Sequence, residues 1–108
     1  MKIPDRVKVG PFYYAVERPE LLINHDHEHL KGESDHQHQV LRIESTLRPR
    51  QAEEVFLHEL LHAVDTFMDT EMSERQVALI ARGLYMALTE SGILAPADEE
   101  RPGNGPPQ

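Results

Sequence analysis

The sequence predicts an α+β domain in which a small antiparallel or mixed sheet of three or four strands packs on two main helices. Three observations predict this class. Short segments of alternating hydrophobicity lie within residues 6–18 and 38–45. Two longer segments with helical periodicity follow, and a short tail is rich in Pro, Gly and charge. The length of 108 residues is that of one domain.

Strands are expected near the start and near the end of the first half of the chain. Residues 6–18, RVKVGPFYYAVER, read as two short strands that are interrupted by the turn signal Gly10-Pro11. Residues 38–45, HQVLRIES, alternate again and predict a further strand. The segment between them, residues 25–39, is polar, and a turn is expected around Lys31-Gly32.

The first helix is expected over residues 51–67, which contain no Gly or Pro, and Pro49 suits its first turn. Apolar residues occur on most of its sides, so the helix is predicted to lie in the core. These residues are Val55, Leu57, Leu60, Leu61, Val64 and Phe67.

The second helix is expected to start after Ser73, which resembles an N-cap, and to end at Ser91-Gly92. Its buried stripe is predicted to consist of Val77, Ile80, Ala81, Leu84 and Leu88. One domain is therefore expected over residues 1–96. The tail, residues 97–108, is predicted to be disordered because Pro, Gly and charge dominate it.

The composition argues against several classes of function. A net charge of −8 disfavours nucleic acid and anionic membranes as partners, because phosphate binding needs clustered Lys and Arg. The chain has no Cys, which excludes disulfides and thiolate metal sites. It has no apolar run long enough to cross a membrane and no apolar signal region at its start, so a cytoplasmic protein is expected.

The first helix carries the motif H-E-x-x-H at His58, Glu59 and His62. Residues four apart lie on one helix face, so both imidazoles can reach one metal ion. The glutamate beside the first histidine then serves as a general base. The alternative is a chance pair in a His-rich chain. Leu57 and Leu60 make the helix too apolar for a surface helix, and uncompensated burial of the motif would be costly, so a metal site is favoured.

A third ligand must come from another segment, because two histidines fill only half of a tetrahedral zinc site. Glu71 and Glu74 are the candidates, and Glu74 is preferred because a rigid helix can aim its side chain. Glu74 could instead be an ordinary acidic residue at a helix N-terminus. Asp65 lies too far along the first helix to join the ion, and is expected to support His62 as an outer partner.

The other five histidines lie in the polar segment, at His25, His27, His29, His36 and His38. A solvated loop is the expected role of this run, rather than a second metal site. His36 or His38 could line the cleft and stabilise an oxyanion. Tyr85 is a further candidate for the site, but packing at the edge of the core is favoured.

The segment HELLHAVDTFMDTEMSERQVALIARGLYMAL resembles the small zincin-like proteins of phages and bacteria, which are distantly related to ImmA/IrrE-type metallopeptidases. The resemblance covers residues 7–94. It implies a gluzincin-type site with one Zn²⁺ per chain, in which His58 and His62 are metal ligands and Glu59 is catalytic. Glu74 matches the family's third ligand, although longer gluzincins place that glutamate further along the chain.

The predicted function is hydrolysis of peptide bonds by a zinc-activated water, with Glu59 as general base. The substrate would be a peptide or one specific protein, and residues 40–44 are expected to offer their edge to it by strand addition. The alternative is a metal-stabilised binding or regulatory module without turnover. Glu59 argues against the alternative, because a structural zinc site needs no base and closes its fourth position.

Overall fold

The computed structural model describes residues 1–98, and it begins with the predicted hairpin. Strand β1 (Arg6–Val9) pairs antiparallel with β2 (Phe12–Glu17), with Val9 opposite Phe12 and Arg6 opposite Ala15. Gly10 adopts a φ of 58° in the turn, a left-handed conformation that suits glycine. The turn signal in the sequence therefore marks the hairpin correctly.

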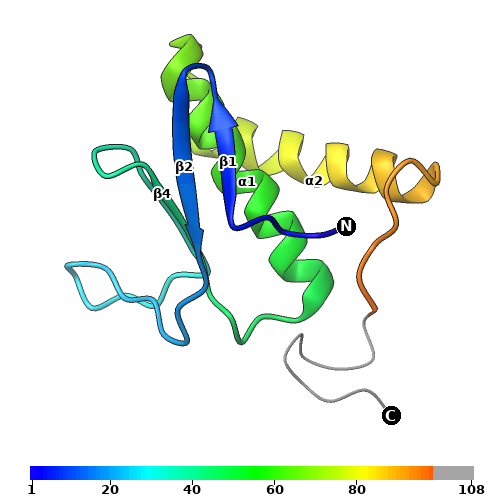
Figure 1. Ribbon diagram of the computed structural model, residues 1–108, viewed down its shortest axis with the longest axis horizontal. Coiled ribbons are helices and arrows are strands. Elements are labelled where there is room, and N and C mark those ends of the chain that lie inside the picture. The colour runs from blue at the N-terminus through cyan, green and yellow to red at the C-terminus, as the bar shows by residue number, and fades with distance from the viewer. Residues whose placement is uncertain (99–108) are drawn as a thin grey trace.

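Two further strands complete a four-stranded mixed sheet in the order β1-β2-β4-β3. β4 (Val40–Ile43) runs parallel to β2 on one side and antiparallel to β3 (Gly32–Asp35) on the other. Figure 1 shows β1 and β2 side by side, with the long excursion of residues 18–31 leading away from the sheet. The sheet and two helices confirm the predicted α+β class.

The sheet corrects two expectations. The polar segment was expected to be a loop with a turn at Lys31-Gly32, but Gly32 begins strand β3. Residues 40–44 were expected to offer a strand edge, but β4 lies between β2 and β3. Both edges of β4 are therefore paired, and the terminal strands of the sheet are β1 and β3.

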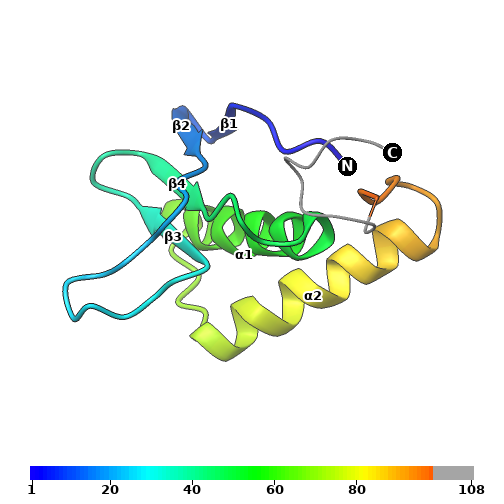
Figure 2. The ribbon, with the colours of Figure 1, turned by 90° about the horizontal axis from the view of Figure 1, so that it is seen from below.

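Two helices lie on the same side of the sheet. α1 (Pro49–Met68) contacts β1, β3 and β4, and α2 (Glu74–Glu90) packs on α1. Figure 2 shows α1 between the sheet and α2. Pro49 occupies the first turn of α1, as predicted. Of the helices in the described part of the chain, none is long and apolar enough to cross a membrane.

The core lies between the sheet and α1. Leu41 and Ile43 of β4 are fully buried, and they pack with Phe56 and Ala63 of α1. Burial of such side chains contributes about 25 cal/mol for each Å² of apolar surface removed from water. The expected burial of the helix end was wrong for Val64 and Phe67, which are exposed.

α2 buries a narrower face than its sequence suggests. Val77, Ala81 and Tyr85, each one turn apart, are buried. Ile80 and Leu84, expected in the buried stripe, are 47% and 48% exposed. The physical reason is that α2 contacts α1 alone among the helices and strands, so only one side of the helix is covered.

The chain beyond α2 returns towards the start of α1. The Ala97 carbonyl accepts a hydrogen bond from Arg50 Nε at 2.9 Å, and its amide donates to the buried Glu53 carboxylate at 3.2 Å. The predicted disorder of the tail concerns residues 97–108, and all but the first two of these lie outside the described residues.

Candidate metal centre

The two motif histidines lie one above the other on α1. Their rings have centroids 4.9 Å apart, and their side chains are 21% and 24% exposed for His58 and His62. A helical spacing of four residues produces this stacking. Both rings can therefore reach a ligand from solvent while α1 holds their positions.

Glu74 is brought to the histidines by the connection between the helices. Asp69 ends α1 in a left-handed conformation, and Ser73 caps α2. The Ser73 hydroxyl accepts a hydrogen bond from the Gln76 amide, and the Gln76 side chain accepts one from the Ser73 amide, which forms a capping box. Because the cap fixes where α2 starts, it also fixes the position of Glu74.

The same connection is anchored by Asp65. Its carboxylate accepts hydrogen bonds from the Thr70 hydroxyl at 2.5 Å and from the Met72 amide at 3.0 Å. These hydrogen bonds lower the pKa of Asp65, and the His62 ring contributes less. Asp65 therefore binds the segment that carries Glu74, whereas the sequence suggested direct support of His62.

The Glu74 carboxylate bridges the two imidazoles. Oε1 lies 2.7 Å from Nε2 of His58, and Oε2 lies 2.8 Å from Nε2 of His62. One ligand atom from each residue lies within 4.8 Å of the other two. Tetrahedral zinc places its ligand atoms about 3.3 Å apart, so the three side chains need only small adjustments to hold the ion.

The donor set of two imidazoles and one carboxylate suits zinc. Among residues 1–98, His58, His62 and Glu74 form the one group of this kind, with no fourth protein ligand. Glu71, the other candidate, is an exposed residue of the connection and is not part of the group. The structure brings together the three residues expected as ligands and leaves a fourth position for a small molecule.

Glu59 points from α1 towards the sheet side of the site and is only 7% exposed. Its Oε1 accepts a hydrogen bond from the Ser34 hydroxyl of β3 at 2.8 Å. Burial raises the pKa of Glu59, and the Ser34 hydrogen bond and the His62 ring partly oppose this rise. A carboxylate with a raised pKa is a better proton acceptor than an exposed one.

A cavity of 470 Å³ gives access to this carboxylate. Its lining includes His58 and Glu59 of α1, Gly32 of β3, and Ala78 and Arg82 of α2. Glycine is required at position 32, because a Cβ there would lie 2.6 Å from Val55 Cγ1 and 2.9 Å from Glu59 Oε2. The close approach of β3 to α1 thus forms one wall of this cavity, next to Glu59.

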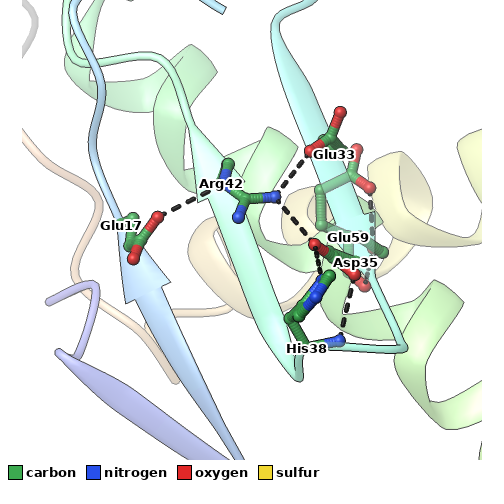
Figure 3. A network of polar contacts seen from close by, with 7 residues as sticks. Glu17, Glu33, Asp35, His38, Arg42 and Glu59 are labelled. Carbon is green, nitrogen blue, oxygen red and sulfur yellow. Dashed lines mark hydrogen bonds and ion pairs between the residues drawn. The ribbon is translucent and has the colours of Figure 1, made fainter. Parts of the chain in front are cut away.

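Strand β3 is held in the sheet by Arg42 of β4 (Figure 3). The Arg42 guanidinium lies 2.7 Å from Glu33, 3.3 Å from Asp35 and 3.2 Å from Glu17. Asp35 also accepts two hydrogen bonds from His38, which lower its pKa to about 2. This network tethers the terminal strand that carries Ser34.

Sequence reasoning missed Gly32 and Ser34. Both lie in the polar segment GESD, which contains no apolar residue and gives no strand signal. The spacing of two residues between them was the available clue, because alternate residues of a strand share one face. In the structure that face is turned towards Glu59.

The remaining histidines have separate roles. His29 Nε2 lies 2.6 Å from the buried carboxylate of Glu44, and His25 and His27 are exposed. His36 lies between the hydroxyls of Tyr14 and Thr66, at 3.2 Å from each. Because Thr66 is one helical turn after His62 on α1, His36 lies about one turn along α1 from His62. His38 contacts Asp35 instead.

Tyr85, the last candidate from the sequence, is not part of the group formed by His58, His62 and Glu74. Its hydroxyl donates a hydrogen bond to Glu53 at 2.6 Å, in the core between α1 and α2. This contact supports the expected packing role.

Comparison of the chain with models of known protein families, with curated proteins and with solved structures finds no match. The resemblance to zincin-like proteins therefore depends on the motif residues alone, and the function of the site is inferred from its geometry.

Proposed function

We propose that this chain is a small zinc-dependent peptidase, with His58, His62 and Glu74 as metal ligands and Glu59 as general base. The observation that carries the proposal is the convergence of three ligand side chains next to a buried carboxylate. Chance surface histidines would not account for the aligned imidazoles, the bridging glutamate and the base candidate together.

Each group has a distinct task in this reaction. When bound, zinc would supply a Lewis acid that lowers the pKa of water and polarises a peptide carbonyl. Glu59 takes a proton from the attacking water and delivers it to the leaving amine nitrogen. Its raised pKa suits both transfers. Ser34 holds Oε1 of Glu59 and so orients the carboxylate as a positioning residue.

The terminal strand β3 is the place where a peptide backbone can add to the sheet. One side of β3 pairs with β4, and β3 is last in the strand order. Gly32 and Glu59 both line the 470 Å³ cavity, so an extended substrate along β3 would pass the general base. This replaces the role expected for residues 40–44.

The alternative is a metal-stabilised binding module without turnover, and Glu59→Gln separates the two functions. Glutamine keeps the shape of the side chain but cannot accept a proton. We expect the variant to bind zinc as the wild type does and to lose cleavage of a proteome-derived peptide mixture, measured by mass spectrometry. Glu90→Gln, at the far end of α2, is the control and should cleave normally. Cleavage that persists unchanged in Glu59→Gln would contradict the mechanism. Zinc binding without any cleavage by the wild type would support the binding module.

A further inference from the structure

A groove follows the free edge of strand β3. This hollow of 740 Å³ is lined by Glu33, Ser34 and Asp35 of the strand. Successive residues of a strand point to opposite faces of the sheet, so a hollow that touches three of them in a row lies along the strand edge. Of β4, which the structure describes in full, no residue lines the hollow, so the edge concerned is the unpaired one. We call this hollow the edge groove.

The excursion of residues 18–31 supplies a second part of the wall, and residues 36–38 complete it. From the excursion, the groove is lined by Ile23, Asn24 and His25. The Leu30 amide donates a hydrogen bond to the Leu22 carbonyl at 2.8 Å, which joins the two arms of the excursion. His29 Nε2 lies 2.6 Å from the buried carboxylate of Glu44. The excursion is therefore fastened both to itself and to the end of β4.

The edge groove continues towards the candidate metal centre. Gly32, the residue before Glu33, lines the 470 Å³ cavity together with Glu59. Consecutive residues of β3 thus line the two hollows. A peptide that pairs with the free edge of β3 would run through the groove and reach Glu59. At about 3.3 Å per residue, the peptide residues beside Glu33 and Asp35 lie about one and three residues from the one beside Gly32.

The side chains of β3 at the groove carry a surplus of negative charge. Glu33 and Asp35 pair with Arg42, and Glu17 pairs with the same guanidinium (Figure 3). Hydrogen bonds from His38 lower the pKa of Asp35 to about 2, so this carboxylate is ionised at neutral pH. Among the described residues, no Lys or Arg lines the groove. A cationic side chain that enters the groove is therefore attracted, and an acidic side chain is repelled.

The alternation of β3 places this charge on one face of a bound peptide. Ser34 points to Glu59, whereas Glu33 and Asp35 point to the other face, where they contact Arg42. Residues that lie opposite each other in paired strands have their side chains on the same face. The peptide side chains beside Glu33 and Asp35 would therefore lie next to these two carboxylates.

We propose that the edge groove binds an extended basic peptide, with a Lys or Arg side chain at the residue beside Glu33 or Asp35. This residue lies about one to three residues from the cleaved bond, on the side towards Asp35. Its position relative to the cleaved bond rests on the proposed peptidase function, whereas binding of the basic peptide to the strand edge does not.

Binding is measured by NMR titration of ¹⁵N-labelled protein with blocked peptides. The probes are acetyl-Ala-Ala-Lys-Ala-Ala-amide, the same peptide with Glu in place of Lys, and the Lys peptide with N-methylated backbone amides. We expect saturable shifts at Ile23, Ser34 and His36, and at least about 10-fold tighter binding of the Lys peptide than of the Glu peptide. N-methylation should weaken binding strongly, because it removes the donors that strand addition needs. Equal affinities for the Lys and Glu peptides, shifts outside the groove, or undiminished binding of the N-methylated peptide would overturn the proposal.

Two matched pairs of variants locate the binding. Ile23→Lys adds a cation to the groove without touching Arg42, and it should abolish the preference for the Lys peptide. Leu21→Lys adds the same charge at an exposed position outside the groove and should keep the preference. Glu33→Gln should reduce the preference, whereas Glu20→Gln, an exposed position outside the groove, should not. Equal effects within either pair would show that the overall charge, and not the groove, selects the peptide.

Cleavage specificity distinguishes failure of this proposal from failure of the peptidase function. In a proteome-derived peptide mixture, we expect Lys and Arg to be enriched about one to three residues from the cleaved bond, on one side of it. Ile23→Lys should lose the enrichment and Leu21→Lys should keep it. Cleavage without a basic preference would overturn the role of the groove and leave the peptidase function intact. Preferential binding of the Lys peptide by a protein that cleaves nothing would support the groove and contradict the peptidase.

Discussion

The Ser34 hydroxyl lies 2.8 Å from Oε1 of Glu59 and 2.9 Å from the backbone carbonyl oxygen of the same residue. This pair joins the terminal strand of the sheet to the helix that carries His58 and His62. Arg42 in turn tethers that strand through Glu33 and Asp35. The orientation of the proposed general base therefore depends on a strand whose residues are all polar or glycine.

Replacing Ser34 by Ala should raise the pKa of Glu59 further, because the hydrogen bond from Ser34 lowers it. As the pH is lowered, a base with a higher pKa becomes protonated, and therefore inactive, at a higher pH. The acidic limb of the kcat/KM profile should therefore shift to higher pH. We expect kcat to fall by about 10–100-fold with little change in KM. NMR titration of the Glu59 carboxyl carbon in metal-free protein gives the pKa directly. Ser34→Thr retains the hydroxyl and should restore the wild-type value. An unchanged Glu59 pKa in Ser34→Ala would show that the hydrogen bond has no such role.

The identity of the third ligand is tested by a matched pair of variants. Glu74→Ala should reduce zinc affinity strongly, because it removes one of three ligand side chains. Glu71→Ala should leave the affinity unchanged, since Glu71 lies outside the group. Competition with a chelator of known zinc affinity measures both. The reverse order of effects would assign the ligand to Glu71.

Asp65→Ala should weaken zinc binding although Asp65 is not a ligand. The variant removes the acceptor for Thr70 and Met72, and the connection that positions Glu74 would become more mobile. We expect a loss of about 10–100-fold in zinc affinity, together with a lower melting temperature of the metal-free protein. Asp5→Asn, at an exposed acid before β1, is the control. A zinc affinity that survives in Asp65→Ala would mean that the capping box at Ser73 positions Glu74 unaided.

Asp35 should titrate well below an ordinary aspartate. Hydrogen bonds from His38 lower its pKa to about 2, with a smaller contribution from Arg42. Because the pKa of Asp35 is lower in the folded than in the unfolded chain, its ionised carboxylate stabilises the fold at pH values above the unfolded-state pKa. This stability is lost as the pH falls from about 4 to about 2. NMR titration of the carboxyl carbon should therefore give a midpoint near the lower value. Asp35→Asn should destabilise metal-free protein near neutral pH and much less in acid. A midpoint at the ordinary value would rule out the hydrogen bonds that His38 donates to Asp35 in Figure 3.

The elements with strong local signals were predicted from the sequence. Alternation and Gly10-Pro11 gave the hairpin, and Ser73 gave the start of α2, since turns and caps depend on a few adjacent residues. The ligand group could be predicted for a similar reason. Helical spacing aligns His58 with His62, and the short connection limits where Glu74 can lie.

The parts that depend on tertiary contacts were not predictable in the same way. β3 has no apolar alternation, and it forms a strand because its backbone pairs with β4 while Gly32 fits against Val55. The buried face of α2 was assigned too widely, since Ile80 and Leu84 have helical spacing but no element covers them. The formation of β3 and the width of the buried face of α2 depend on which elements pack together. A single sequence indicates such packing only weakly.

A zinc titration of metal-free protein, with His62→Ala and His27→Ala beside the wild type, tests directly whether the protein has a metal centre. Three ligands on two rigid helices predict one zinc per chain, and binding should raise the melting temperature because zinc binds the folded state. His62→Ala should lose stoichiometric binding and the thermal shift, whereas His27→Ala, in the exposed excursion, should keep both. Absence of stoichiometric zinc in the wild type, or equal losses in the two variants, would contradict a metal centre at His58, His62 and Glu74.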